Sequence, residues 1–400
     1  MGVAVNHVPL THDEVVERTR KLAANFAKRA VETEKMRRVS QATVDEIVDA
    51  GLVEAMVPLR WGGHGLGWRT LVAASIEVGK ACGSTAWCFS FFLGHEWLVG
   101  QYGEELRQRV WEDPRTLFGN SFAASGGKVR PVPGGYRVSG RWSWSSGIDY
   151  CHWVALGGLI PPHDGHEAEM RMFALPRRDY RIEDVWNSSA MRGTGSNDII
   201  VEDAFVPEEF TCKFNETLDG RPIEPMEDDP VNVWRSPFVT AFPLLVVGPI
   251  LGLARGAYET FIGTMKTKVN AYTGQNLSDL TPIQIRIAES AAELDAAELI
   301  VYNAIERLST EKSIEKVRSV PFRALTYRDY ILAAQMAVRS VDRLFSVSGA
   351  RSLGADHPMQ RHWRDIHAAA SHIGMTVDPV YEGFGRVELG LPRNPGTVMF

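Results

Sequence analysis

Residues 141–153 read RWSWSSGIDYCHW and lie at the centre of the segment that decides the fold. The strand-like run YRVSG precedes them at 136–140, and further short apolar or alternating runs follow, separated by Gly, Pro, Asp and Asn. Short strands with turn residues at regular intervals are typical of a β domain. We therefore predict a compact β domain over residues 114–230. Within it, the serines that alternate with two tryptophans in RWSWSSG suggest a surface built to hold a flat group with polar edges.

The pattern is helical on the N-terminal side of this segment. Apolar residues recur at three- and four-residue spacing over residues 10–35, which predicts a long helix. Thr11 is followed three residues later by Glu14, which is the arrangement of a capping box at a helix start. A second helix is predicted over residues 40–50, with Gly51 as its C-cap. Residues 1–113 are therefore expected to form an N-terminal helical domain.

The pattern is helical again on the C-terminal side, beyond the polar linker EPMEDDPVN. Two long segments, 283–308 and 324–349, are amphipathic. The longest apolar run, 241–254, contains two prolines and is shorter than a helix that spans a bilayer, so we expect a buried helix there. Residues 231–400 are therefore expected to form a C-terminal helical domain.

Composition and charge exclude several classes of partner. The chain has 400 residues, 44% of them hydrophobic and 23% charged, with a net charge of −6, which is ordinary for a soluble globular protein. No run of Lys or Arg indicates a nucleic-acid or membrane partner. The four cysteines form no CxxC pair and the N-terminus has no apolar signal core, so we expect a cytoplasmic protein. Histidines 362, 367 and 372 are five residues apart and fall on different helix faces, so no metal site is expected.

Three motifs, in this order along the chain, resemble the acyl-CoA dehydrogenase fold family. They are MVPLRWGGHGLG at 56–67, MRGTGSNDIIVEDAFVPEE at 191–209 and MQRHWRDIHAAASH at 359–372. The resemblance covers nearly the whole chain, and the set is specific although each motif alone is weak. It implies a mainly α fold with a central β domain: an N-terminal helical domain, a β-barrel middle domain and a C-terminal four-helix bundle.

Within that fold the chain looks most like the oxygenase components of two-component flavin-dependent monooxygenases, which include hydroxylases of 4-hydroxyphenylacetate and of steroid-derived phenols. This resemblance implies that a separate NAD(P)H:flavin reductase supplies reduced FMN (FMNH2) by diffusion, with FAD as a possible substitute. Oxygen would add to the flavin to give a C4a-hydroperoxyflavin, which hydroxylates an aromatic, phenolic substrate. Members of the family are generally homotetramers, so the resemblance implies the same here.

The resemblance also assigns residues to the flavin. Trp144 would pack near the flavin ring, and the Ser146 hydroxyl would accept a hydrogen bond at N5, which slows the loss of hydrogen peroxide from a dry pocket. Asn120 and Thr194 are expected to be further flavin contacts. A polar β-hairpin with an aromatic core pair is the structural alternative for RWSWSSG.

A second group of residues is assigned to the substrate and to proton movement. By the same resemblance, His95 and Ser121 would hydrogen-bond the phenol and favour its phenolate, although a free phenol titrates near pH 10. His372 would lie near the flavin C4a position and act as an acid or a base. His95 as a buried core residue and Ser121 as a turn residue are the structural alternatives.

Two cations and four aromatic residues complete the predicted site. Lys268 and Arg351 are candidates for the flavin phosphate, because fewer phosphate-binding cations suit a mononucleotide better than a dinucleotide. Surface ion pairs are the alternative for both. Four aromatic residues are expected either to line the substrate pocket or to belong to the core: Trp87, Phe91, Phe92 and Trp97.

The competing function is an FAD-dependent acyl-CoA dehydrogenase. Its base would be Glu382 in YEGFGRVELG, because members of that group often carry a catalytic Glu in a Tyr-Glu-Gly-Thr segment. Phe384 stands here in place of the Thr, and the default role of Glu382 is a helix-surface residue. Two further alternatives are an N- or S-oxygenase on the same scaffold and a non-enzymatic flavin carrier.

Overall fold

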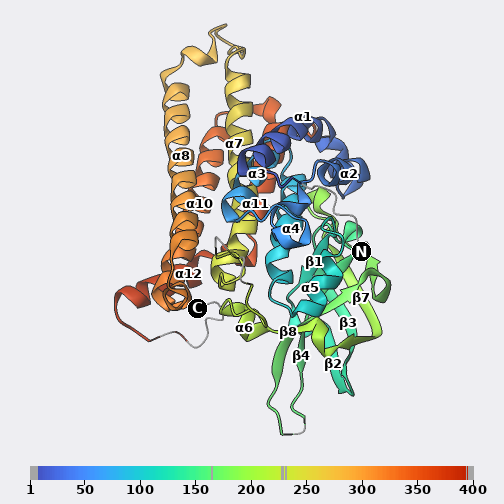
Figure 1. The fold of residues 1–400 in the computed structure, drawn as a ribbon. Helices are drawn as coiled ribbons and strands as arrows, with labels where there is room; N and C mark the ends of the chain where they lie inside the picture. The colour runs from blue at the N-terminus through green and yellow to red at the C-terminus, as the bar shows by residue number, and fades with distance from the viewer. Residues whose placement is uncertain (1–7, 164, 227–228, 230–231, 393, 395–400) are drawn as a thin grey trace.

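The computed structural model describes residues 8–163, 165–226, 229, 232–392 and 394. Figure 1 shows helices at the N-terminal end of the chain, strands in the middle of the sequence and long helices towards the C-terminus, with the strands below the helices in that view. The order of helical, β and helical segments follows the sequence pattern.

The N-terminal helices begin where the sequence signals them. The side chain of Thr11 accepts from the Glu14 backbone N–H and the Glu14 side chain accepts from the Thr11 N–H, so the predicted capping box is confirmed. Ser40 caps the second helix, which ends at Asp49 with Ala50 as its C-cap. The helices of this part are α1 (His12–Met36), α2 (Gln41–Asp49), α3 (Trp68–Ala81), α4 (Gly83–Val99) and α5 (Glu104–Trp111).

The central part is built from two four-stranded sheets. One has the strand order β1-β4-β5-β8 and the other β2-β3-β7-β6. The strands are β1 (Phe118–Ser121), β2 (Gly127–Val132), β3 (Gly135–Ser145), β4 (Trp153–Ile160), β5 (Glu169–Pro176), β6 (Arg181–Glu183), β7 (Asn197–Pro207) and β8 (Thr211–Lys213).

The two sheets stay open, so the expected closed β-barrel is wrong for the described residues. Each sheet ends in its own edge strands, and no described strand pairs with a strand of the other sheet. The fully buried Trp142 of β3 instead donates its indole N–H to the Gly157 carbonyl of β4 at 2.7 Å. A side-chain layer therefore joins the sheets where a barrel would need a continuous ladder of backbone hydrogen bonds.

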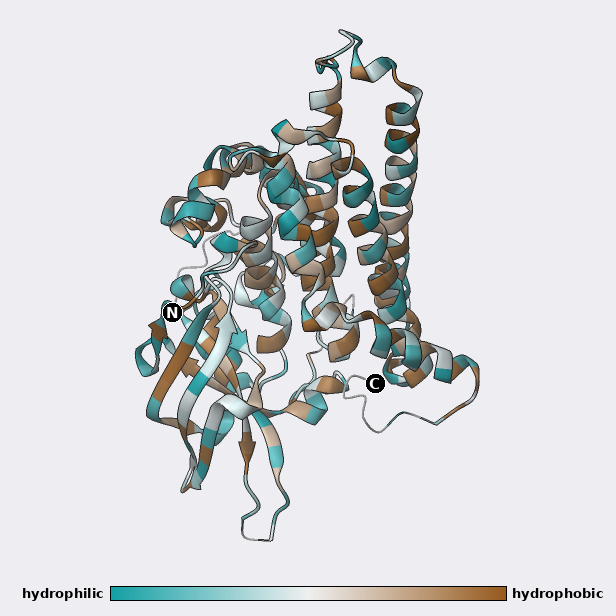
Figure 2. Ribbon diagram, turned by 180° about the vertical axis from the view of Figure 1, so that it is seen from behind, coloured by the Kyte–Doolittle hydropathy of each residue, from teal (hydrophilic) through white to brown (hydrophobic). Residues whose placement is uncertain are grey.

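The C-terminal part is organised around α7, which packs against α3, α4, α10 and α11. By length and composition alone α7 could cross a membrane, but 94% of its most apolar window is buried inside the protein, which confirms the expected buried helix. Figure 2 shows apolar residues along the central helices and polar residues on outer helix faces. The helices are α6 (Phe214–Leu218), α7 (Phe238–Met265), α8 (Thr281–Thr310), α9 (Ile314–Arg318), α10 (Val320–Phe345), α11 (Pro358–Ala370) and α12 (Val377–Glu388).

Candidate active site

A chain of hydroxyl groups joins the turn after β3 to the turn before β7. The hydroxyl oxygens of Ser146 and Ser196 are 2.8 Å apart, and those of Ser196 and Thr194 are 2.7 Å apart. The Trp87 indole N–H of α4 donates to the Ser146 hydroxyl at 3.0 Å. The Gly147 backbone N–H also donates to the Thr194 carbonyl at 2.8 Å, so the two turns are fixed to each other by backbone as well as by side chains.

Both turns depend on glycine. Gly147 has a φ of 67° and Gly195 a φ of 54°. Both lie in the left-handed backbone region, which residues other than glycine rarely adopt. A Cβ on Gly147 would lie 2.8 Å from the ring of Phe92. The Gly in RWSWSSG is therefore required both by its backbone conformation and by the close approach of α4.

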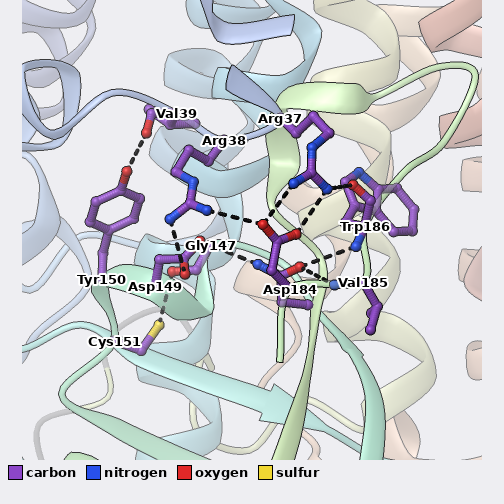
Figure 3. Close-up of polar contacts among 11 residues, drawn as sticks. Arg37, Arg38, Val39, Gly147, Asp149, Tyr150, Cys151, Asp184, Val185 and Trp186 are labelled. Carbon is purple, nitrogen blue, oxygen red and sulfur yellow. Dashed lines mark hydrogen bonds and ion pairs between the residues drawn. The ribbon is translucent and has the colours of Figure 1, made fainter. Parts of the chain in front are cut away.

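The end of α1 holds the same region from the side, as Figure 3 shows. Arg37 donates to both carboxylate oxygens of Asp184, at 2.8 and 2.7 Å, and to the Trp186 carbonyl at 2.7 Å. Arg38 forms an ion pair with Asp149 at 3.7 Å, and Asp149 lies two residues after Gly147. These contacts tie the turn that carries Ser146 to the N-terminal helices.

Aromatic rings from α4, α7 and the segment after α11 pack against one another next to Ser146. On α4 the rings of Trp87, Phe91 and His95 follow at four-residue spacing, with 5.2 Å between successive centroids. Phe242 of α7 lies 6.0 Å from Phe91 and 5.6 Å from His372. His372 in turn lies 5.5 Å from Trp87, so the rings form a closed circuit. The structure thus brings His95, Ser146 and His372 to one aromatic-walled region.

His95 is neutral and offers a hydrogen-bond acceptor. Its Nδ1 donates to the Phe118 carbonyl at 2.5 Å, so the proton of the neutral ring sits on Nδ1 and Nε2 carries a lone pair. Nε2 is buried and has no hydrogen-bond partner among the described residues. Burial lowers the pKa of His95 to about 4, so the ring stays neutral at ordinary pH.

His372 carries its ring proton on the other nitrogen. It lies just after α11, and its Nδ1 accepts from the Gly374 backbone N–H at 3.1 Å. The proton of the neutral ring is therefore on Nε2, which is a donor. Burial lowers the pKa of His372 to about 4. The aromatic-walled region thus has one neutral histidine that accepts and one that donates.

Asn120 and Ser121 lie on β1, where it approaches β3 of the other sheet, and Trp144 lies on β3. The Ser121 hydroxyl donates to the Ser143 carbonyl at 2.9 Å, so its proton is used within the protein. The Asn120 amide nitrogen is buried and lacks a partner among the described residues. Trp144 is 65% exposed and packs edge-on against Trp186 at 6.1 Å, so its ring lies at the protein surface.

Lys268 and Arg351 are not at this site within one chain. The Lys268 ammonium donates to the Ser348 carbonyl, beyond the C-terminal end of α7. From Phe242 to Met265, α7 extends about 35 Å at 1.5 Å per residue. That length far exceeds the ribityl chain between the ring and the phosphate of a flavin. The two predicted phosphate contacts therefore lie too far from Ser146 to bind the same flavin in one chain.

Glu382 is placed on the surface of α12. Its carboxylate accepts from the Asn394 amide at 2.9 Å and pairs with Arg386 at 3.7 Å. A base that removes a proton next to a thioester must face an enclosed pocket, and an exposed, paired carboxylate does not. The predicted default role of Glu382, a residue of the helix surface, agrees with this position.

The residues of the site fit a flavin ring. The hydroxyl chain ends at the partly exposed Ser146, next to the rings of Trp87 and His372. Two buried polar atoms without partners among the described residues lie on the surrounding elements, on Asn120 and Ser145. Buried polar groups are normally satisfied, so unpaired ones are consistent with a ligand that has polar edges.

Sequence reasoning missed Ser196 and the bridging role of Trp87. The hydroxyl of Thr194, a predicted flavin contact, bonds Ser196 and the Met191 carbonyl within the protein. In MRGTGSND, residues 194 and 196 flank a glycine, which is typical of a turn that carries two hydroxyls. The sequence does not show that this turn lies next to Ser146, because Ser146 and Ser196 are fifty positions apart.

Two family profiles match the chain. The profile described as acyl-CoA dehydrogenase, N-terminal domain, matches residues 10–112, and that described as acyl-CoA dehydrogenase, C-terminal domain, matches residues 244–377. The matched regions are the two helical parts of the fold, on either side of the two sheets.

Individual proteins and structures match over nearly their whole length. The chain is 33% identical over 381 residues to the flavin-dependent monooxygenase, oxygenase subunit HsaA, of Rhodococcus jostii (strain RHA1), covering 94% of this chain and 98% of that protein. It is 30% identical to the FADH(2)-dependent resorcinol hydroxylase, oxygenase component, of Rhizobium sp. (strain MTP-10005), covering 95% of each. The structure of XiaF from Streptomyces sp. in complex with FADH2 and glycerol matches with a TM-score of 0.87 at 25% identity, covering 97% and 98%.

Proposed function

The chain belongs to the acyl-CoA dehydrogenase fold family and, within it, to the oxygenase subunits of flavin-dependent monooxygenases, and on this premise we propose that it hydroxylates a phenolic substrate. It is a monooxygenase that uses a reduced flavin and O2, and a separate reductase component supplies the electrons. The resemblance inferred from the sequence motifs is confirmed by these relatives. The dehydrogenase alternative is not favoured by them.

The free acceptor on His95 is the observation that carries the proposal of a phenol. A buried lone pair on Nε2 pairs with a ligand O–H, and the neighbouring ring of Phe91 suits an aromatic ligand. Since the pKa of His95 is about 4 and that of a free phenol is about 10, His95 does not remove the phenol proton in the ground state. It accepts a hydrogen bond that strengthens as the ring carbon gives up electrons.

The other residues hold protons and exclude water. A bound reduced flavin supplies the oxygen-activating chemistry. Ser146 accepts a hydrogen bond from the flavin edge, and the rings of Trp87 and Phe242 keep water away from that edge. His372 offers its Nε2–H as a donor to oxygen atoms in the same space. An amine or thioether acceptor would use the same residues and is the competing substrate class.

The proposal includes FMN as the flavin and a second copy of the chain as part of its binding site. Lys268 and Arg351 lie near each other, since the positive charge of Arg351 contributes to a lowered pKa of Lys268, after the larger effect of burial. Such a cation pair suits one phosphate group. In a homotetramer a neighbouring copy can bring the pair to the flavin held by Ser146. FAD is the competing cofactor, because one relative is named as FADH(2)-dependent and the XiaF structure is a complex with FADH2.

The remaining parts of the proposal concern transfer and location. Reduced flavin would reach the oxygenase by diffusion from the reductase. All four cysteines are free and buried, which suits a reducing compartment and supports a cytoplasmic location.

The test supplies chemically reduced FMN or FAD anaerobically, then adds O2 and a panel of phenols, aromatic amines and thioethers. Mass spectrometry with ¹⁸O₂ detects oxygen transfer to each compound. We expect ¹⁸O in a ring hydroxyl of at least one phenol, without added reductase protein. Label only in amines or thioethers would contradict the substrate class. Oxidation of an acyl-CoA by the protein would contradict the function.

A further inference from the structure

The hydroxyl chain at Ser146 has a direction that can be worked out from its contacts. Each hydroxyl has one proton, and three hydroxyls take part: Ser146, Ser196 and Thr194. At one end the Thr194 hydroxyl lies 3.1 Å from the Met191 carbonyl, which can only accept. At the other end the Trp87 indole N–H, which can only donate, lies 3.0 Å from the Ser146 oxygen.

Only one arrangement gives every contact a proton. Thr194 donates to the Met191 carbonyl, so Thr194 must accept from Ser196. Ser196 has then used its proton and must accept from Ser146. The reverse direction would leave the contact between Thr194 and the Met191 carbonyl without a hydrogen. Thr194 and Ser196 are 2% and 5% exposed, so bulk water does not compete freely for these groups.

We propose that Ser196 and Thr194 are positioning residues that turn the Ser146 hydroxyl proton away from the flavin, so that Ser146 can only accept a hydrogen bond there. Ser146 receives the Trp87 N–H and keeps one lone pair for a ligand. This inference rests on the proposed function, because it concerns the flavin edge that Ser146 would contact. It assigns the role to two residues that act through Ser146 and not by touching the substrate.

The consequence is selection of the flavin by its redox state. A reduced flavin carries a hydrogen on N5 and is a donor there, whereas an oxidised flavin has a lone pair on N5 and needs a donor. A Ser146 hydroxyl with its proton fixed towards Ser196 pairs with the reduced form and opposes the oxidised form. The oxidised product would therefore leave more readily than the reduced flavin.

The test measures the dissociation constants of reduced and oxidised FMN for the whole protein, anaerobically and without substrate or O2. Ser196→Ala and Thr194→Val each free the Ser146 proton, so the preference for reduced flavin should fall about three- to ten-fold, chiefly through tighter binding of oxidised flavin. Thr194→Ser keeps the hydroxyl and should restore the preference. Ser84→Ala is the matched control, because Ser84 accepts from the Gly193 N–H at 3.1 Å and supports the same turn outside the hydroxyl chain.

The outcomes separate the inference from the proposed function. If the wild-type protein binds neither redox form, the proposed function fails. An unchanged ratio in Ser196→Ala and Thr194→Val, with a clear preference in the wild type, overturns the inference alone. A ratio that falls equally in Ser84→Ala would mean that the turn matters only structurally, and this too overturns the inference.

Discussion

At the scale of single residues, His95 is the most direct contact that the site offers to a phenol. Replacing it in His95→Phe keeps an aromatic ring beside Phe91 but removes the Nε2 acceptor. We expect the KM for the phenol to rise about ten-fold, because one hydrogen bond in a buried site is lost. Reduced flavin should bind with unchanged affinity. His367→Phe is the matched control, since His367 is a partly exposed histidine of α11 that pairs with Asp342 of α10.

The pH dependence of the reaction follows from the same residue and from His372. Burial lowers the pKa of each ring from its ordinary value of 6.5 to about 4. Both rings therefore stay neutral as pH falls through 6.5, and the acceptor on His95 is lost only near pH 4. We expect the acidic limb of kcat/KM for the phenol near pH 4 to 5. A limb near 6.5 that disappears in His95→Phe would show that His95 titrates as an exposed histidine does.

At the scale of elements, α4 places His95 at the site and buries the carboxyl group of Glu96 outside it. Glu96 follows His95, about 100° further round the helix, and accepts from the Trp111 indole of α5 at 2.5 Å. Burial raises the pKa of Glu96 to about 8, and burial also raises that of the nearby Glu54 to about 7. Neither carboxyl forms an ion pair with a described residue, so both favour the protonated form.

This arrangement predicts that the protein loses stability as pH rises. A carboxyl whose pKa is raised in the folded state stabilises it fully below its unfolded pKa of 4.5, and the contribution is lost as pH rises towards 8. In Glu96→Gln the fall in unfolding free energy between pH 5.5 and 8.5 should shrink by on the order of 2 kcal/mol. Urea unfolding at the two pH values measures it. An equal fall in both proteins would mean that Glu96 is ionised in the folded state.

The turn between β3 and β4 carries Ser146, and its stability can be tested at Gly147. Gly147→Ala combines a left-handed backbone with a Cβ 2.8 Å from the buried ring of Phe92. Gly134→Ala is the matched control, because Gly134 has a φ of 79° with nothing within 4 Å of the added Cβ. We expect about 1 kcal/mol of destabilisation in Gly134→Ala and a further 1–3 kcal/mol in Gly147→Ala.

The affinity for reduced flavin should also differ between the two variants. It should weaken in Gly147→Ala only, because Ser146 moves with the turn while the hairpin at Gly134 does not contact the site. Equal losses of stability in the two variants would show that Phe92 yields to the added methyl group.

The local features of these elements were predictable and their long-range contacts were not. Thr11 and Glu14 form the predicted capping box because both partners lie within one helical turn of the sequence. The open sheets were not predictable in this way, because strand pairing joins residues far apart in the sequence, as in the pairing of β1 with β4. The role of Ser196 was not predictable for the same reason, since its partner Ser146 lies in another turn.

At the scale of the whole molecule, the separation of the predicted binding residues has a consequence for assembly. Ser146 lies beside the aromatic rings at the N-terminal end of α7, whereas Lys268 lies beyond its other end, about 35 Å along the helix from Phe242. If both contact one flavin, they belong to different copies of the chain. Symmetric oligomers place such pairs across an interface in every site.

This prediction can be tested by subunit complementation. Ser146→Ala and Lys268→Ala, each made alone, should bind reduced flavin weakly. When the two variants are co-expressed with different tags and purified as a mixed oligomer, a site between unlike copies can combine an intact Ser146 with an intact Lys268. We expect tight binding to return in a fraction of the sites of the mixed oligomer. The double variant Ser146→Ala/Lys268→Ala co-expressed with itself is the control and should show no recovery. If the mixed oligomer binds no better than its parents while Lys268→Ala alone is impaired, Lys268 acts within its own chain, and the shared site is wrong.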